Sequence, residues 1–384
     1  MPVEAVAAVG TTTMEITVNK FELLRELTAT QGVVERKTTI PILSNYLFEA
    51  AGDKLSITAT DLDLSLRTSC NAKVEKEGAC TIPARKLHDY VKLLPDADIT
   101  IKLLENHWVS IRCGRSNTKM VGMARSNFPS LPAFPTAGVM QIPAKVLRGL
   151  IAKTGFAIAN EESRYTLNGA LMVLKPESIT MVATDGHRLA HIERGGEKFE
   201  GISGEMKTLV PKKAMDELKS LVDSTEVETI DFAKDESTLF FRIGPRLLTS
   251  RQLTGQFPNF EAVLPKGNDK SITLHGEDFG AAISRVAQFA DERSRAVRLK
   301  LEKGELKLSA SSSETGESED SLEIDYNGDT LTIGFNAQYI LEFLKAVGAG
   351  DVKLELKDAQ SAGQLRPAES EDYKYRYIVM PMRI

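Results

Sequence analysis

The stretch PARKLHDYVKLLPDADITIKL, residues 83–103, returns twice in altered form, as PKKAMDELKSLVDSTEVETIDF at 211–232 and as NAQYILEFLKAVGAGDVKLEL at 336–356. Each copy has the pattern of an amphipathic helix, then a turn rich in Gly or Asp, then an alternating strand. The copies start 128 and 125 residues apart. This spacing is much longer than a solenoid repeat, so it indicates that a whole domain has been copied three times.

Two further sets of segments recur in the same order. Helix-like segments start at Asn19, Pro143 and Glu277, and alternating strand-like segments follow each of them. Alternation of apolar and polar residues is typical of half-buried antiparallel strands. The predicted fold class is therefore α+β, with three tandem copies of a domain in which two helices pack on antiparallel sheet. The expected organisation is a flexible N-terminal extension at 1–13 followed by domains at 14–137, 138–268 and 269–384.

The composition excludes several classes of protein. The chain is 42% hydrophobic and 26% charged, so each domain can bury a core, and a disordered or fibrous chain is excluded. Apolar runs are far too short for a membrane span. Three cysteines without a CxxC motif indicate reduced thiols in the cytoplasm rather than a disulfide frame or zinc site. The net charge of −5 means that a DNA-binding protein would have to gather positive charge on one face.

Three predicted helices carry basic residues away from their apolar stripe. These residues are Arg85, Lys86, Lys145, Arg148, Lys212 and Lys213. They fit ordinary solvated helix faces. They also fit several equivalent helices that turn toward one polyanion and attract phosphates without reading bases. On the residues alone both interpretations stay open.

The segment ATDGHRLA at 183–190 and the C-terminal VMPMRI at 379–384 are more specific. Together with TIPIL at 39–43 and FPNFEAVLP at 257–265, they make the chain similar to bacterial DNA polymerase III beta subunits, the replicative sliding clamps. The similarity runs from Met14 to Ile384. The resemblance implies a processivity factor, without catalysis or cofactor, that encircles duplex DNA. Two copies would join head to tail, so that each chain forms half of a six-domain ring.

The resemblance also implies a pocket between the second and third domains that takes the apolar end of a partner peptide. Arg164, His187 and Arg188 are expected to orient peptide polar groups at its rim. The rest of the implied lining comprises Thr184, Gly186, Leu189, Pro258, Val263, Gln338, Ile378, Met380, Pro381 and Met382. Gln338 stands where relatives often have a small Ser, which is expected to reshape one sub-site.

DNA contacts and a subunit interface follow from the same resemblance. The implied DNA-binding residues are Lys37, Arg85, Lys86, Lys145, Arg148, Tyr165, Lys212 and Lys213. Thr118, Lys119 and Met120 of one copy are expected to face Gln288 and Phe289 of the other. The implied partners are a second copy of the chain, double-stranded DNA bound without sequence preference, the DNA polymerase III alpha subunit, the clamp loader, and other polymerases and repair proteins that carry a clamp-binding peptide. No membrane partner and no metal are expected.

Two other functions are compatible with parts of the sequence. Asp185-Gly186-His187 with His191 could form a hydrolase dyad or a metal site. On a strand, however, His187 and His191 would lie about 13 Å apart, too far to share a metal. The chain also has no GxSxG, HExxH or phosphate-binding loop motif, which disfavours an enzyme. The non-enzymatic alternative is a peptide-binding scaffold without a DNA role.

Overall fold

The computed structural model describes residues 13–35, 38–161, 165–196, 198–314, 316–370 and 372–383. Lys37, Arg164 and almost all of the extension predicted at 1–13 lie outside the described residues. The described residues form six α-helices, at the places where the repeats predict them. These are α1 (Lys20–Thr30), α2 (Ala84–Leu93), α3 (Ala144–Thr154), α4 (Lys212–Asp223), α5 (Gly276–Val286) and α6 (Ala337–Val347).

Capping residues explain where the helices begin. Pro83 and Pro143 are the N-cap residues of α2 and α3, with ψ angles of 111° and 129°. Proline has a fixed φ and lacks an N–H, so it can end a strand and begin a helix without losing a hydrogen bond. At α1 the side chain of Asn19 accepts hydrogen bonds from the backbone N–H groups of Phe21 and Glu22. Such caps satisfy donors that the first helical turn leaves unpaired.

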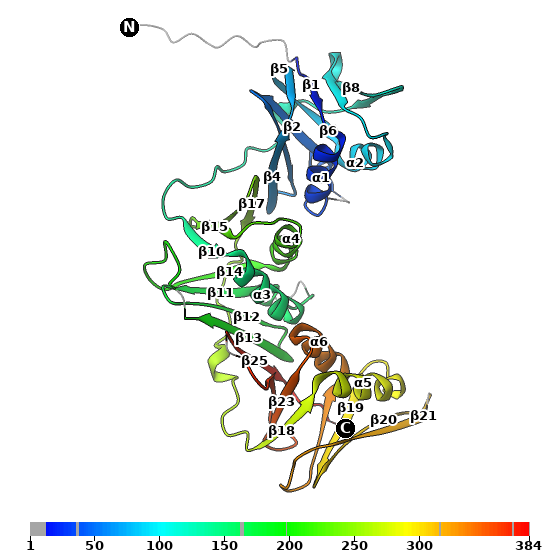
Figure 1. Cartoon of the computed structure of the whole chain (residues 1–384), viewed down its shortest axis with the longest axis vertical. Coiled ribbons are helices and arrows are strands. Elements are labelled where there is room, and N and C mark those ends of the chain that lie inside the picture. The colour runs from blue at the N-terminus through cyan, green and yellow to red at the C-terminus, as the bar shows by residue number, and fades with distance from the viewer. Residues whose placement is uncertain are drawn as a thin grey trace. The chain divides into compact units, whose positions relative to one another are not determined.

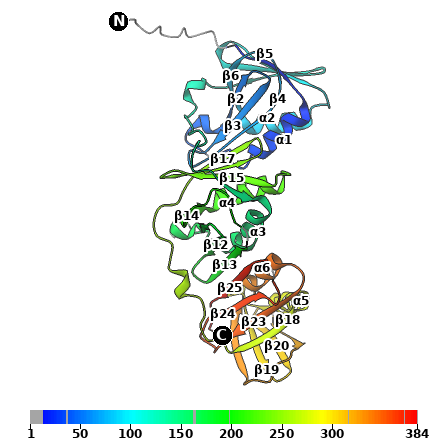
Figure 2. The same ribbon diagram turned by 60° about the vertical axis from the view of Figure 1, so that its left-hand side comes forward.

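The described chain divides into two compact units. The first unit comprises the residues up to Val139 together with Ser220–Arg251. Its strands are β1 (Glu15–Val18), β2 (Asn45–Ala51), β3 (Lys54–Thr60), β4 (Leu64–Asn71), β5 (Lys73–Lys76), β6 (Gly78–Pro83), β7 (Ile99–Leu103), β8 (Trp108–Cys113), β9 (Ser116–Val121), β15 (Thr229–Lys234), β16 (Thr238–Ile243) and β17 (Arg246–Arg251). One sheet has the order β5-β1-β7-β8-β9, and another contains the run β15-β16-β17-β4-β3-β2-β6. Helices α1 and α2 lie side by side against this unit's sheets (Figures 1 and 2).

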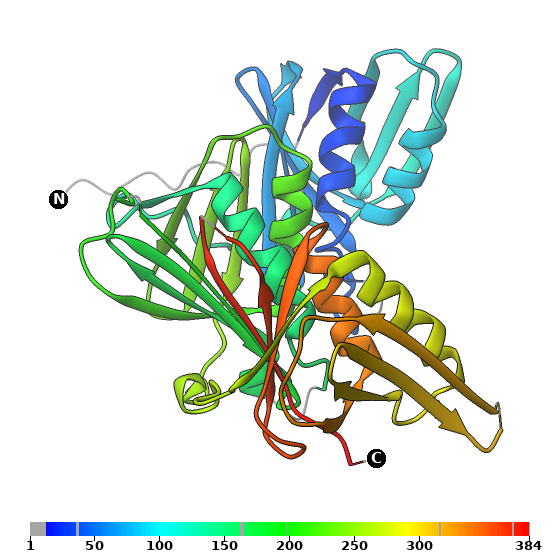
Figure 3. The same ribbon diagram turned by 60° about the horizontal axis from the view of Figure 1, so that its bottom comes forward.

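The second unit comprises Met140–Lys219 and Gln252–Ile384. Its strands are β10 (Met140–Pro143), β11 (Gly169–Lys175), β12 (Ser178–Thr184), β13 (Arg188–Gly195), β14 (Met206–Pro211), β18 (Lys270–His275), β19 (Ala296–Glu302), β20 (Glu305–Ser312), β21 (Gly316–Glu323), β22 (Leu331–Asn336), β23 (Asp351–Leu356), β24 (Gly363–Pro367) and β25 (Lys374–Val379). One sheet has the order β14-β11-β12-β13-β25-β24-β23-β18, and the other β21-β20-β19-β22. Helices α5 and α6 pack against each other (Figure 3).

The large sheet of the second unit is covered on both faces. Leu171 and Val173 of β11 pack with Phe257, which belongs to a segment that we call the strap, residues 252–265. The alternate residues Met172 and Leu174 point to the other face, where α3 packs on the neighbouring strands, and both are fully buried. A strand buried on both sides needs apolar residues at every position, which explains the run GALMVL.

The sheets continue across the predicted domain boundaries. In the first unit β4 pairs antiparallel with β17, so that Leu66 lies opposite Leu248. In the second unit β13 pairs antiparallel with β25, so that Leu189 lies opposite Ile378. Each pairing joins the fourth strand of one repeat to the last strand of the next. The exact boundaries near residues 137 and 268 stay a prediction, because the two compact units cut through the second repeat.

Candidate functional site

The turn between β12 and β13 holds the motif that the sequence singled out. The hydroxyl of Thr184 donates a hydrogen bond to the carbonyl of Arg188 at 2.6 Å. The Oδ1 atom of Asp185 accepts hydrogen bonds from the backbone N–H groups of His187 and Arg188, at 2.9 and 3.1 Å. Gly186 has φ of 89°, a conformation that side chains disfavour. The motif is therefore first of all a tightly built turn, which leaves Gly186 and His187 exposed.

Arg188 was expected at the rim of a pocket, but its side chain is buried. Its Nε donates to Asp185 at 3.0 Å and its Nη2 to the carbonyl of Phe156 at 2.6 Å, while its Nη1 donates to Glu342. The guanidinium also lies 4.3 Å above the ring of Tyr339. The hydrogen-bonding capacity of Arg188 is therefore used inside the protein, and its expected role at the rim stays a prediction.

The charge of Arg188 is compensated where it lies. Burial of the guanidinium acts to lower its pKa, but the hydroxyl of Tyr377 and the carboxylate of Glu342 outweigh this and raise the pKa of Arg188. A buried charge that is fully paired is costly to disturb, because removing one partner leaves the other without compensation. Arg188 thus connects β13 to α6 and β25.

Apolar side chains meet beside this turn. Leu189 and Ile378 belong to one buried cluster with Val182, Leu209 and Phe257. Two predicted lining residues that lie near this cluster along the chain are large exposed hydrophobics, Val263 with 45% and Met380 with 44% of its surface exposed. The backbone N–H of Met380 donates to the carbonyl of His187 at 2.9 Å, which places the C-terminal segment against the turn. The arrangement supplies an apolar surface with a buried base, suited to an apolar peptide end.

Other predicted lining residues lie in separate hollows. Pro381 and Met382 line a cavity of about 610 Å³ with Ile333, Gly334 and Thr332 of β22. Gln338 lines a different cavity of about 580 Å³. It reaches the turn only indirectly, because its amide donates to Glu342 at 2.9 Å. The structure thus brings Leu189, Ile378 and Met380 together but does not bring Gln338 into the same surface.

Six of the eight residues predicted to contact DNA lie on three helices. Arg85 and Lys86 of α2, Lys145 and Arg148 of α3, and Lys213 of α4 are exposed. Lys212 is half-buried, with its Nζ 3.7 Å from Asp216. Tyr165 exposes 53% of its surface. These side chains form basic surfaces on the helices without a base-reading constellation.

The residues predicted for the subunit interface lie at the edge of one sheet and beside the edge of another. Thr118, Lys119 and Met120 lie on β9, the last strand of its sheet. Gln288 and Phe289 lie in a short 3₁₀ turn, Ala287–Phe289, that contacts β21, the edge strand of another sheet.

The catalytic and metal alternatives find no support in the described part of the chain. No group of three or more His, Cys, Asp or Glu residues that could hold a metal occurs there. Asp185 is engaged with Arg188. The ring of His191 lies 5.5 Å from that of Phe260, and burial lowers the pKa of His191. None of the helices described is both long and apolar enough to span a membrane.

Comparison with known proteins decides the family. Models of the N-terminal, central and C-terminal domains of the DNA polymerase III beta subunit match residues 14–132, 141–259 and 261–383. The beta sliding clamps of Caulobacter vibrioides (strain NA1000 / CB15N) and Pseudomonas putida are each 35% identical, over 97% of this chain and 100% of theirs. The chain belongs to the beta sliding clamp family. The predicted three tandem clamp domains and the predicted role of a sliding clamp as a processivity factor are thereby confirmed, and the family is non-catalytic.

Solved clamp structures agree with this fold. The Caulobacter crescentus clamp, with polyethylene glycol bound to a putative beta-motif tethering region, superposes with a TM-score of 0.90 at 34% identity, over 97% of this chain and 100% of that one. The Pseudomonas aeruginosa clamp bound to griselimycin gives 0.89 at 35% identity with the same coverage. The Bartonella birtlesii clamp bound to griselimycin gives 0.91 at 32% identity, again with the same coverage.

Sequence reasoning on this clamp-family chain missed the residues that hold Arg188. Glu342, Tyr377, Tyr339 and Phe156 come from three separate segments. Glu342 is 154 positions away from Arg188, so no local pattern connects them. The one sequence pattern that involves any of these residues is the spacing of Glu342 four positions after Gln338, which places those two side chains on one helix face.

Proposed function

We propose that two copies of the chain close head to tail into a ring around duplex DNA, and that the apolar surface beside the 184–188 turn tethers partner proteins. In this reading the ring carries no cofactor, performs no catalysis and acts in the cytoplasm. Its partners are the DNA polymerase III alpha subunit, the clamp loader, and other polymerases and repair proteins that present a peptide with an apolar end.

The observation that carries the head-to-tail closure is a pair of unmatched sheet edges. Within the chain, β4 pairs with β17 and β13 pairs with β25. By position in the repeats, the next pair is β21, the fourth strand of the third repeat, with β9, the last strand of the first. Both are edge strands among the described residues. A second copy therefore supplies the missing neighbour at each end, and two such contacts close the assembly.

The charges on the two edges support this pairing. Strand β21 has the sequence GESEDSLE, whereas β9 carries Lys119 and follows Arg112 and Arg115. Opposite charges on facing edges favour one partner and disfavour pairing of like edges. The predicted interface residues Thr118 and Met120 lie on β9 itself.

A ring explains how a chain with a net charge of −5 can hold DNA. The exposed basic residues on α2, α3 and α4 attract phosphates weakly and without regard to sequence. Weak contacts permit sliding, and enclosure prevents escape. Tethering then raises the effective concentration of the polymerase at its template.

The test has two steps. Light scattering on the purified protein should give about twice the chain mass of 42.1 kDa. Protein loaded by a clamp loader on nicked circular DNA should remain bound, and linearising that DNA should release it. A stable monomer at micromolar concentration, or equal retention on linear DNA, would refute ring closure. Peptide binding without retention on either circular or linear DNA would leave a peptide-binding scaffold without a DNA role.

The tether is tested separately by removing Met380–Ile384. This variant should lose binding to a peptide that copies the clamp-binding end of the polymerase alpha subunit, because Met380 is an exposed apolar residue beside the turn. Dimerisation should be unchanged. Peptide binding of undiminished strength would show that the surface is assigned to the wrong place.

A further inference from the structure

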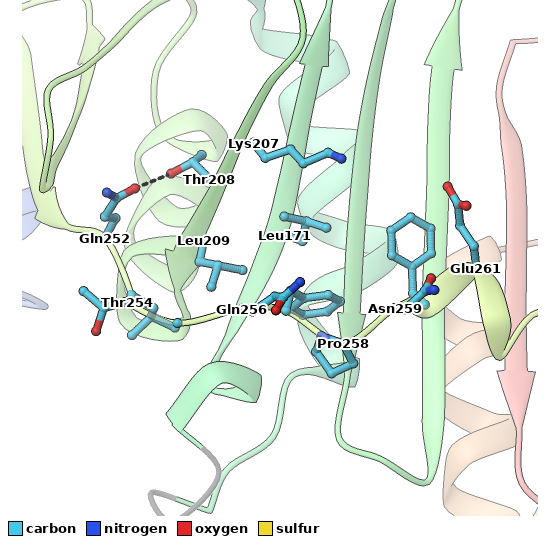
Figure 4. Close-up of a pocket in the computed structure, with 14 residues that line it drawn as sticks. Leu171, Lys207, Thr208, Leu209, Gln252, Thr254, Gln256, Pro258, Asn259 and Glu261 are labelled. Carbon is cyan, nitrogen blue, oxygen red and sulfur yellow. Dashed lines mark hydrogen bonds between the residues drawn. The ribbon is translucent and has the colours of Figure 1, made fainter.

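The strap, residues 252–265, has a second hollow that the proposed tether does not use. Two residues of the strap, Pro258 and Val263, belong to the predicted peptide surface. The stretch from Gln252 to Glu261 also encloses a cavity of about 700 Å³ with β14 and β11, shown in Figure 4. This volume lies within the range of pockets that take small ligands or a few side chains.

The base of this cavity is apolar. Leu171 of β11 and Leu209 of β14 form it together with Phe257, and all three are at least nine-tenths buried. Leu253 and Phe260 of the strap pack against the same cluster. The cluster is the one that contains Leu189 and Ile378 beside the 184–188 turn. The cavity and the predicted peptide surface therefore share both a base and a wall, since Pro258 belongs to each.

The mouth of the cavity is polar and mostly uncharged, with Lys207 and the exposed Glu261 as its two charged residues. Thr254, Gln256 and Asn259 line it and are exposed. The side chain of Thr208 donates to that of Gln252 at 3.0 Å, as Figure 4 shows. The charged Lys207 lies 2.8 Å from Glu205, so its charge is already compensated. Amides and hydroxyls of this kind suit the backbone of an extended peptide, which offers neutral donors and acceptors.

The cavity is built in advance of any ligand. The N–H of Leu253 donates to the carbonyl of Leu209 at 3.1 Å and ties one end of the strap to β14. At the other end, Arg376 donates to the carbonyl of Pro265 at 3.4 Å. Gly255 has φ of 109°, and a Cβ there would lie 2.7 Å from the methyl carbon of Thr166. The strap is held at both ends and has a glycine where it comes nearest to Thr166. It therefore loses little conformational entropy when a ligand binds.

Resting on the proposed function, we propose that this cavity is a second subsite for the same partner chain. It takes an extended, uncharged stretch next to the apolar end, with one apolar side chain on Leu171, Leu209 and Phe257. The partner crosses the strap at the exposed Pro258. Continuity with the tether surface selects this occupant, because a segment bound there reaches the cavity without leaving the protein.

The experiment compares two peptides by fluorescence anisotropy. The short one copies only the apolar end of the polymerase alpha subunit's clamp-binding peptide, and the long one carries about eight more residues on each side, enough to cross the strap. The long peptide should bind about tenfold tighter, which is the gain of one well-seated side chain. Thr254→Trp should abolish this advantage by filling the mouth, with the affinity for the short peptide unchanged.

Ala262→Trp is the matched control, because Ala262 is an exposed strap residue that does not line the cavity. It should preserve the advantage of the long peptide. If both peptides bind the unmodified protein equally, or if Thr254→Trp leaves the difference intact, the second subsite is refuted while the tether stands. If neither peptide binds, the proposed tether itself fails.

Discussion

Two turns of this molecule, residues 60–64 and 184–188, share one backbone design but present different surfaces. In each, a threonine hydroxyl donates to the carbonyl four residues later, at 3.0 Å in the first and 2.6 Å in the second. In each, an aspartate Oδ1 accepts the two backbone N–H groups that close the turn. Each turn leads into a strand that pairs with the last strand of the next repeat.

The side chains at the fourth position of the turn make the difference. In the first turn Asp63 lies 3.3 Å from Arg251 of β17, an exposed ion pair. In the second turn the corresponding positions carry His187 and Met380, with the same backbone hydrogen bond between them. One junction is thus covered by charges and the other keeps an apolar surface. One repeated backbone design thus presents an exposed ion pair at one site and an exposed apolar side chain at the other, through side chains alone.

The two junctions also differ in their buried ties, and breaking them should have the largest effect. In the first unit Arg246 binds Glu26 at 3.0 Å, and their side chains are 4% and 1% exposed. Arg246→Met should destabilise the unit by about 3–5 kcal/mol, because Glu26 would remain buried with less compensation. Calorimetry should show a lower Tm. Arg242→Met is the control, since its pair with Asp231 is partly exposed and should cost less than about 1 kcal/mol.

The pH dependence of stability tests the same buried ion pair. Burial acts to raise the pKa of Glu26, but hydrogen bonds from Arg246, Thr68 and Arg25 outweigh it and lower the pKa. The stabilisation is therefore present above the carboxyl's ordinary pKa and is lost as pH falls through the lowered folded value. Thermal unfolding between about pH 6 and 3 should lose more stability in the unmodified protein than in Glu26→Gln. Parallel curves would contradict the role of this carboxylate.

Arg188→Met should have the next largest effect, about 2–3 kcal/mol, because hydrogen bonds to two carboxylates and a carbonyl are lost. The cost is smaller than for Arg246 since Glu342 and Asp185 are partly exposed and can be solvated. The partner peptide should also bind more weakly, because the turn loses its anchor. Arg194→Met, which breaks an ion pair with the exposed Asp372, should change neither property. An unchanged Tm of the Arg188→Met protein would contradict the stabilising role of the buried Arg188 side chain and favour its position at the rim.

Exchanging the surfaces tests the comparison directly. The double variant H187D/M380R recreates the charged cover of the first turn on the second. It should weaken the partner peptide at least tenfold, about 1.4 kcal/mol or more, by removing an apolar contact. Stability should change by less than about 1 kcal/mol, because exposed ion pairs contribute little. Titration calorimetry with the short peptide measures the peptide affinity, and thermal unfolding measures the stability. Tight binding by this variant would mean that the apolar surface lies elsewhere.

The smallest expected effect concerns the third position of each turn. Leu62 has φ of 83° where Gly186 has 89°. Leu62→Gly should relieve strain of about 1 kcal/mol, offset in part by the greater freedom of the unfolded chain, for a net gain of about 0.5 kcal/mol. By the same balance, Gly186→Leu should lose about 0.5 kcal/mol. Tm measurements on the two variants test this prediction. Changes of the same sign would contradict a role for backbone strain at the third position of the turns.

Much of the fold could be predicted from the sequence. The apolar stripe Leu87, Tyr90, Val91 and Leu94 predicts the helix that begins after Pro83. The three aliphatic residues are buried as expected, and Tyr90 is half-buried. Helix and strand periodicity depends on neighbours a few residues apart, so local sequence contains it. The inward turn of Arg188 could not be predicted in this way, because its partners Glu342 and Tyr377 lie far along the chain. The surroundings of Gln338 could not be predicted for a similar reason, since they depend on how α6 packs.

By itself the sequence determined the threefold repeat, the helices and strands of each copy, and membership of the sliding clamp family, because all of these follow from periodicity and from motifs in contiguous residues. Only the tertiary structure decided which sheet edges pair, which arginines are buried, and which of the two equivalent turns keeps an apolar surface. Those outcomes depend on contacts between segments more than a hundred residues apart, where small differences in packing and charge select one arrangement.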